Sequence, residues 1–225
     1  MKIAGRRSTK PPKLGRPAGA DADATRTLIL EGALEAFAAS GFDGVSVREL
    51  TRRLGVSHNL VHHYFGSKDN LWREAIDRGI ADQLAWMLEG MTDLGESDDP
   101  FEAVSVALQL FVRVVAQLPA FPLILAQESA IGGERLDYIY ERAIVPAVKI
   151  GTRHLARLED AGGAKFDMRS LALILSAGAS GLVTLSSIAR KLGEPDPLGD
   201  EAVEKYADTL SRLVLNGLRG APVAP

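Results

Sequence analysis

The sequence predicts an all-α protein in which a three-helix head, containing a helix-turn-helix, is joined to a larger helical body. Three observations support this fold class. Alanine and leucine are abundant and alternating β-branched runs are scarce, which favours helices over strands. Residues 46–68 have the pattern of two short helices around a tight turn, followed at once by a third helix. After that stretch, apolar residues recur at helical spacing in one segment after another.

Residues 1–21 are predicted to be a basic arm that is disordered when free. They combine prolines with little apolar content, so they cannot bury enough surface to offset the entropy lost on ordering. Arg16, which lies between a glycine and a proline, has the chemistry of a minor-groove insertion, although a plain linker explains it equally well. A first helix is expected over about 22–40, and Gly41 would end it.

The helix-turn-helix is predicted from its caps and its turn. Ser46 and Glu49 form a capping box, so a helix should follow over 47–54 with an apolar stripe on one face. Gly55 allows the positive φ that ends this helix in a sharp turn. A second helix over about 58–64 would be the one that enters a major groove of DNA.

The body is predicted to contain six further helices. A glycine pair at 132–133 separates two of them, and Pro146 should kink the helix in which it lies. Proline at the first turn favours the start of another helix at Pro100. The expected ranges are about 68–94, 100–118, 122–130, 134–160, 171–189 and 201–218.

Residues 171–189 form an uncharged stretch of nineteen residues, which is long enough for a membrane span. We reject that interpretation because five of the residues are serine or threonine and two are glycine, so membrane insertion would be only marginally favourable. A helix buried from all sides in a helical bundle explains the stretch equally well. The small residues would allow another helix to approach closely.

Charge is distributed unevenly along the chain. The formal net charge is −3, yet residues 1–78 carry 13 basic against 9 acidic side chains, and the rest carries 13 against 20. A basic end on an acidic body favours docking on a polyanion in one orientation. The chain has no cysteine, which excludes disulfides and thiolate metal sites, and the start lacks the apolar region of a signal peptide. A cytoplasmic location is therefore expected.

A run of about fifty residues in and around the helix-turn-helix carries a family resemblance. The residues concerned are Ile29, Leu30, Ala33, Leu34, Phe37, Gly41, Phe42, Val45, Ser46, Val47, Arg48, Glu49, Leu50, Gly55, Val56, Ser57, Tyr64, Phe65, Ser67, Lys68 and Leu71. Taken together, the run resembles the TetR-type bacterial transcriptional regulators. Four positions depart from the usual pattern, namely His58, Asn59, Leu60 and His62. They lie on the presumed reading helix and put the operator sequence in question more than the fold.

The resemblance implies a homodimeric repressor that binds a palindromic operator and is released by a small molecule. It implies a helix-turn-helix DNA-binding domain at 22–72 and a ligand-binding and dimerisation domain at 73–225, whose last two helices build a four-helix dimer interface. No cofactor is expected, and neither a membrane partner nor an enzymatic activity. The few polar groups on mainly apolar helices suggest an apolar or amphipathic effector.

Ten residues are candidates for DNA contact. Tyr64 and Lys68 stand where the family contacts phosphate, and Lys68 begins a helix whose free amides add positive potential. Residues on the reading helix would meet base edges, while neighbouring caps and arginines could meet the backbone. The full set is Arg16, Ser46, Arg48, Ser57, His58, Asn59, His62, His63, Tyr64 and Lys68.

Six residues of the body are candidates for lining the effector cavity that the resemblance implies, although each is also explained as ordinary core or surface. They are Trp86, Phe111, Gln127, Glu128, Tyr138 and His154. Two alternatives remain open at this point. One is an all-helical small-molecule carrier or enzyme that retains the head, and the other is a metal sensor using the cluster His58, His62 and His63.

Overall fold

The structure is a computed structural model, and it describes residues 18–94, 98–160 and 167–219. These residues form helices and turns and contain no strand, as the sequence predicts. In chain order the elements are α1 (Ala18–Gly44), α2 (Val47–Leu54), α3 (His58–Phe65), α4 (Lys68–Leu94), α5 (Pro100–Gln117), α6 (Ala120–Ile131), α7 (Glu134–Ile139), the π-helix η1 (Tyr140–Ile144), α8 (Val145–Asp160), α9 (Met168–Thr184), α10 (Ser186–Lys191) and α11 (Asp200–Arg219).

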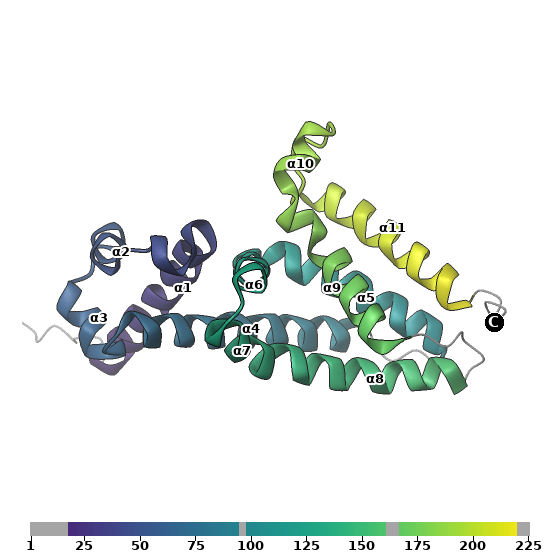
Figure 1. Cartoon of the computed structure of the whole chain (residues 1–225), viewed down its shortest axis with the longest axis horizontal. Coiled ribbons are helices and arrows are strands. Elements are labelled where there is room, and N and C mark those ends of the chain that lie inside the picture. The colour runs from purple at the N-terminus through teal and green to yellow at the C-terminus, as the bar shows by residue number, and fades with distance from the viewer. Residues whose placement is uncertain (1–17, 95–97, 161–166, 220–225) are drawn as a thin grey trace, which may run out of the picture.

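The helices are arranged as a head and a body joined by the long helix α4. Helices α1 to α3 gather around the first part of α4, and the rest of α4 runs into the body, where α4 contacts α5, α6 and η1 (Figure 1). Inside the body α5 packs against α4, α9 and α11, while α6 packs against α1. Because α4 and α6 both touch α1, the head is held to the body at two places.

One hydrophobic core extends from the head to the start of the body. Phe37 of α1, Val61 of α3 and Trp72 of α4 are all buried in it, together with Ile124 of α6 and Ile139 of α7. Burying side chains of this size contributes about 1.5–3 kcal/mol each. The core therefore fixes α3 relative to α1 and α4, and it also fixes α6 and α7 against the head.

The helix ends follow local capping chemistry. The hydroxyls of Ser46, Ser57 and Ser67 accept hydrogen bonds from the amides of Glu49 at 3.4 Å, Leu60 at 3.1 Å and Asn70 at 3.1 Å. Such caps satisfy amides that the first turn leaves without a helical partner. The caps of α2 and α3 are confirmed; the cap of α4 was missed, although Ser67 stands just before it.

Two glycines in the head have the positive φ that their turns require. Gly55 has φ 70° and ψ 22° and ends α2, as predicted. Gly41, with φ 69° and ψ 172°, interrupts α1 where the helix was expected to end, and a short turn follows to Gly44. The beginning of α1 differs from the prediction. Residues 18–21 are already helical, so the prediction that they belong to a disordered arm is wrong. The rest of the predicted arm, residues 1–17, lies outside the described residues.

Pro146 disturbs its helix in the predicted region. Proline lacks an amide donor, and its ring crowds the carbonyl four residues earlier, so a regular α-helix cannot pass through it unchanged. The chain instead forms the π-helical turn η1 directly before Pro146, with the Val145 amide bonded to the Tyr140 carbonyl. The expected single helix over 134–160 is thus α7, η1 and α8.

The uncharged stretch 171–189 differs most from its prediction. It is divided between α9 and the separate α10, with a break at Leu185. It is not buried from all sides within one subunit, because Leu173 is 72% exposed and Ile174 is 61% exposed. The side chain of Leu213 on α11 is likewise uncovered within one subunit, since it is 68% exposed.

Close packing through small residues, in contrast, is confirmed. A Cβ atom on Gly181 would lie 2.7 Å from the Tyr206 hydroxyl, so α9 and α11 approach closely there. Of the described helices, only α5 passes a membrane-span test of length and hydropathy, and it packs against α4, α9 and α11.

Candidate nucleic-acid interface

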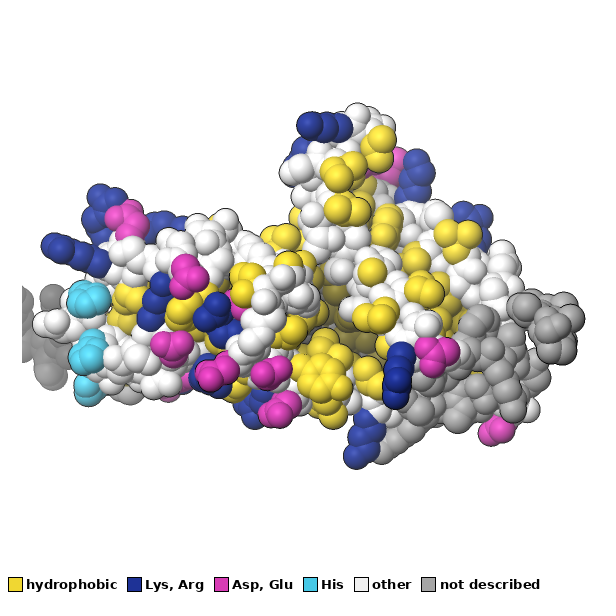
Figure 2. All heavy atoms as spheres, in the orientation of Figure 1, with side chains coloured by type: hydrophobic (Ala, Val, Ile, Leu, Met, Phe, Trp, Pro, Cys, Tyr) yellow, Lys and Arg dark blue, Asp and Glu magenta, His cyan; other side chains and the backbone are white. Residues whose placement is uncertain are grey.

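Helix α3 has one buried and one exposed side. Val61 and Phe65 are each 3% exposed and anchor the helix in the head core. The other side presents four exposed polar residues, which are His58, Asn59, His62 and His63. Figure 2 shows histidine side chains gathered at the free end of the head. An exposed helix with this polar surface is shaped to enter a DNA major groove.

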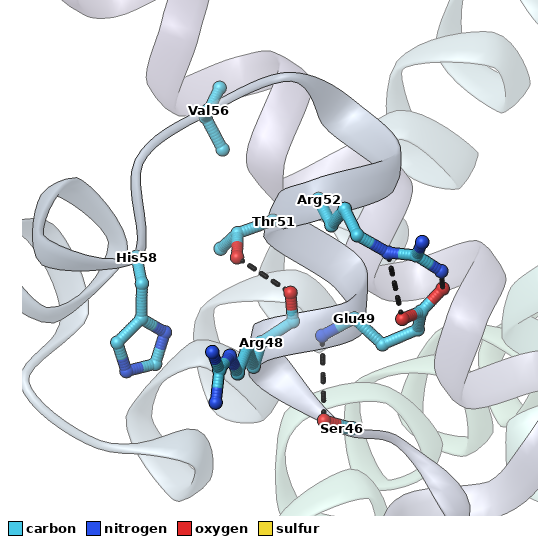
Figure 3. A pocket seen from close by; sticks show the side chains of 7 residues that line it. All are labelled: Ser46, Arg48, Glu49, Thr51, Arg52, Val56 and His58. Atoms are coloured by element: carbon cyan, nitrogen blue, oxygen red, sulfur yellow. Dashed lines mark hydrogen bonds and ion pairs between the residues drawn. The ribbon is translucent and has the colours of Figure 1, made fainter.

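An open hollow of about 410 Å³ lies between α2 and the start of α3. It is lined by Ser46, Arg48, Glu49, Thr51, Arg52, Val56 and His58 (Figure 3). Arg48 and His58 lie on the same side of this hollow, while Arg52 turns away toward Glu49. Among the described residues, no acidic side chain pairs with Arg48. The hollow therefore presents the Arg48 guanidinium, which has no acidic partner among the described residues, beside the His58 imidazole at the start of α3.

The predicted capping box of α2 is only half formed. Ser46 caps the helix, but the Glu49 carboxylate binds Arg52, with its oxygens 3.1 Å from Nε and 2.5 Å from Nη2. Hydrogen bonding to Arg52 lowers the pKa of the Glu49 carboxyl. The carboxylate thus stays charged and holds Arg52, which leaves Arg48 as the freer of the two arginines for phosphate contact.

Tyr64 and Lys68, the two predicted phosphate contacts, are both tied to neighbouring groups. The Tyr64 hydroxyl donates to the Ala22 carbonyl at 3.4 Å. Lys68 is the first residue of α4, and its Nζ lies 4.6 Å from the centroid of the Phe42 ring. Both side chains are half-buried at the base of α3. Arg16 lies outside the described residues.

The structure does not gather the six predicted effector residues into one set. Three of them bind protein groups where the head meets the body: Gln127 donates to the Ala38 carbonyl at 2.7 Å, Glu128 accepts from Arg135 at 3.0 Å, and Tyr138 donates to Asp77 at 3.0 Å. Burial, followed by the hydrogen bond to Asp77, raises the pKa of the Tyr138 hydroxyl.

The other predicted effector residues lie on separate elements. Trp86 is 49% exposed on the second half of α4, and Phe111 of α5 packs against the core that α9 and α11 share. The side chain of His154 lies outside the described residues. No group of three or more potential metal-binding side chains comes together in the described parts of the chain.

Sequence reasoning missed the residues that join the head to the body. Arg142 binds Asp77 of α4 through two hydrogen bonds of 3.0 and 2.7 Å. A second hollow, of about 290 Å³, lies between α4 and the turn before α7. It is lined by Asp69, Trp72, Arg73, Gly132, Gly133, Glu134 and Arg135. The glycine pair was recognised as a helix break, yet its position against α4 depends on contacts that no local pattern contains.

Comparison with known proteins identifies relatives of both the head and the whole fold. The family model described as bacterial regulatory proteins, tetR family, matches residues 29–75. The HTH-type transcriptional repressor AcnR of Corynebacterium glutamicum is 34% identical over 92 residues, which cover 38% of this chain and 48% of that protein. The chain thus spans about half the length of AcnR. The HTH-type transcriptional regulator BetI of Rhizobium meliloti is 30% identical over 145 residues, covering 60% of this chain and 68% of BetI.

Solved structures share the fold over most of the chain. A crystal structure of a HlyIIR mutant protein has a TM-score of 0.67 at 18% identity, covering 90% of this chain and 100% of that one. A bacterial regulatory protein in the tetR family from Rhodococcus RHA1 also has a TM-score of 0.67, at 20% identity, covering 87% of this chain and 97% of that one. These similarities show an arrangement of head and body that is common to the three proteins.

Proposed function

The chain belongs to the TetR family of bacterial regulatory proteins, and from this we propose that it is a DNA-binding transcriptional regulator, a repressor released by a small molecule. The observation that carries the proposal is α3, which is anchored by Val61 and Phe65 and exposes the polar side chains of His58, Asn59, His62 and His63 on its free side. Arg48 and Lys68 flank this helix and supply positive charge for phosphates. The regulator would act in the cytoplasm, and the proposal assigns no catalytic step to the chain.

DNA binding is tested by selecting operators from a random duplex library and measuring affinity against salt concentration. Contacts to phosphate release counterions, so the affinity should fall linearly on a double-logarithmic plot. The selected sequence should be palindromic, because two identical heads would read two half-sites about 34 Å apart. Changing Asn59 or His62 should alter the preferred operator, since these exposed residues of α3 would face base edges. A chain that binds no duplex at low salt would refute the proposed function.

Dimer formation is supported by apolar side chains that one subunit leaves uncovered. Figure 2 shows hydrophobic side chains over α9 and α10 on a single face. The exposed large residues of α9, α10, their flanking turns and α11 are Leu173, Ile174, Leu185, Ile188, Leu192 and Leu213. A soluble subunit rarely exposes so many, whereas a twofold contact would cover them. Sedimentation at micromolar concentration should therefore give a dimer, and a persistent monomer would contradict this part.

The effector is proposed to be an apolar or amphipathic small molecule bound in the body. Figure 2 shows a recess with hydrophobic walls between α6 and α9, above α8. Leu84 and Trp86 of α4 and Val145 at the start of α8 are further exposed apolar groups of the body. Titration with an anionic detergent and with a neutral aliphatic alcohol, followed by tryptophan fluorescence and by release of DNA, tests this class of effector. Release by neither compound, with no change in fluorescence, would argue against it.

A further inference from the structure

Phe42 lies at the corner between α1 and α2, and two cations share its ring. The Nζ of Lys68 is 4.6 Å from the ring centroid, and the guanidinium carbon of Arg135 is 4.3 Å from it. Phe37 stacks on the same ring at 5.9 Å, and Trp72 meets its edge at 6.5 Å. The ring is therefore rigidly held, and it joins a residue of the head to a residue of α7 in the body.

Arg135 is in turn held by a buried carboxylate. Its Nε donates to Glu128 of α6 at 3.0 Å, and the Glu128 side chain is only 2% exposed. The preceding residue, Gln127, donates to the Ala38 carbonyl at the end of α1. Two adjacent residues of α6 thus act on the same corner of the head, one directly and one through Arg135.

These contacts have an electrostatic consequence for Lys68. A cation within about 6 Å of an aromatic ring is attracted by the negative face of the ring, but two cations at one ring repel each other. Glu128 offsets the charge of Arg135 and so reduces this repulsion. The position of the Lys68 ammonium group therefore depends on Phe42, on Arg135 and, through Arg135, on Glu128.

We propose that Phe42 and Arg135 are positioning residues that set the phosphate contact of Lys68 and connect it to the buried Glu128 of α6. The inference rests on the proposed function, because it assumes that Lys68 binds DNA phosphate. It adds a direct side-chain connection between α6 and the DNA surface that does not pass along α4. A movement that separates Arg135 from Glu128 would change DNA affinity through Lys68.

The first test is a double-mutant cycle between Phe42 and Lys68. Phe42→Leu should weaken binding to a mixed-sequence DNA duplex at low salt by about 5-fold, because the Lys68 side chain of each subunit is then no longer held by the ring and must be ordered when DNA binds. Phe42→Tyr keeps the ring and should bind within about 2-fold of the wild type. In the Lys68→Ala background, Phe42→Leu should have no further effect. An equal loss in both backgrounds would show that Phe42 serves the fold alone, and would overturn the proposal.

The second test separates the α6 connection from a general effect of charge. Glu128→Gln should weaken DNA binding by roughly 3-fold, although this buried residue cannot reach DNA, and Lys68→Ala should abolish the difference. Glu204→Gln is the control for net charge, because Glu204 binds Arg113 within the body and its replacement changes the charge of the chain by the same amount. Equal effects of the two substitutions would overturn the α6 connection.

A further pair of variants covers the case in which Glu128→Gln fails to fold. Arg135 is 25% exposed, so its replacement leaves no buried cavity, and lysine or glutamine at this position still carries a hydrogen-bond donor for the Glu128 carboxylate. Arg135→Lys keeps a cation near the ring and the carboxylate and should retain wild-type DNA binding. Arg135→Gln removes the cation that repels the Lys68 ammonium group, so it should shift DNA binding in the opposite direction to Glu128→Gln and tighten it. Identical binding by the two would refute the role of Arg135. A wild-type chain that binds no duplex would instead refute the proposed function and this inference with it.

Discussion

Replacing Gly181 with alanine should destabilise the protein, although alanine favours helices. The Tyr206 hydroxyl donates to the Gly178 carbonyl at 2.6 Å, and a Cβ atom on Gly181 would lie 2.7 Å from that hydroxyl. Burial raises the pKa of Tyr206, so the hydroxyl keeps its proton and remains a donor. The new methyl group would displace the hydroxyl and break this hydrogen bond between α11 and α9.

The expected magnitude follows from two opposing effects. Leaving a partly buried hydrogen-bonding group without its partner costs about 1–3 kcal/mol. Replacing a helical glycine with alanine contributes about 1 kcal/mol of stability. Gly181→Ala should therefore lower the free energy of unfolding by about 1 kcal/mol.

The matched background is Tyr206→Phe, which removes the hydroxyl and keeps the ring. The next atom near the added Cβ is then the ring carbon Cζ at 3.8 Å, an ordinary van der Waals distance. In that background Gly181→Ala should stabilise the protein by about 1 kcal/mol, so the sign of the effect reverses. Urea unfolding of the four proteins at one fixed concentration measures the cycle, since dimer stability depends on concentration. A stabilising Gly181→Ala in the wild type would refute the reasoning.

Three further results are expected. Lys68→Ala should weaken binding to all DNA sequences alike and reduce the salt slope by roughly two units for a dimer, and an unchanged slope would contradict the phosphate role. Deleting residues 1–20 removes six basic side chains per subunit and should also reduce the salt dependence of DNA binding. The expected reduction is about half of the value that would result if all six side chains contacted phosphate. An unchanged salt dependence would show that the arm does not contact DNA. Hydrogen bonding to Arg113 lowers the pKa of Glu204, so this pair stabilises the fold above the ordinary glutamate pKa and loses that effect as pH falls through the lowered value. The difference in unfolding midpoint between the wild type and Glu204→Gln should accordingly shrink in acid, and a difference that grew in acid would reverse the assigned sign.

The sequence by itself determined most helix boundaries in the head. The caps of α2 and α3 and the glycine turn at Gly55 lie within a few residues of the groups they satisfy. Such interactions join residues that are close in the sequence, so spacing and residue type suffice to predict them. The candidate DNA-contacting residues of α3, in contrast, were predicted through the family resemblance, which placed His58, Asn59 and His62 on the presumed reading helix.

Only the tertiary structure decided what the polar groups of the body do. Gln127 and Glu128 looked like candidates for an effector cavity, yet they bind Ala38 and Arg135. The Phe42 ring contacts the cations of Lys68 and Arg135, which lie 26 and 93 positions further along the chain. No local period encodes such distances, because they depend on how whole helices pack. For the same reason, composition did not predict that 171–189 is divided into two helices. Composition also did not predict the exposed apolar face of this segment, because the same apolar side chains occur in a core and in a contact between subunits.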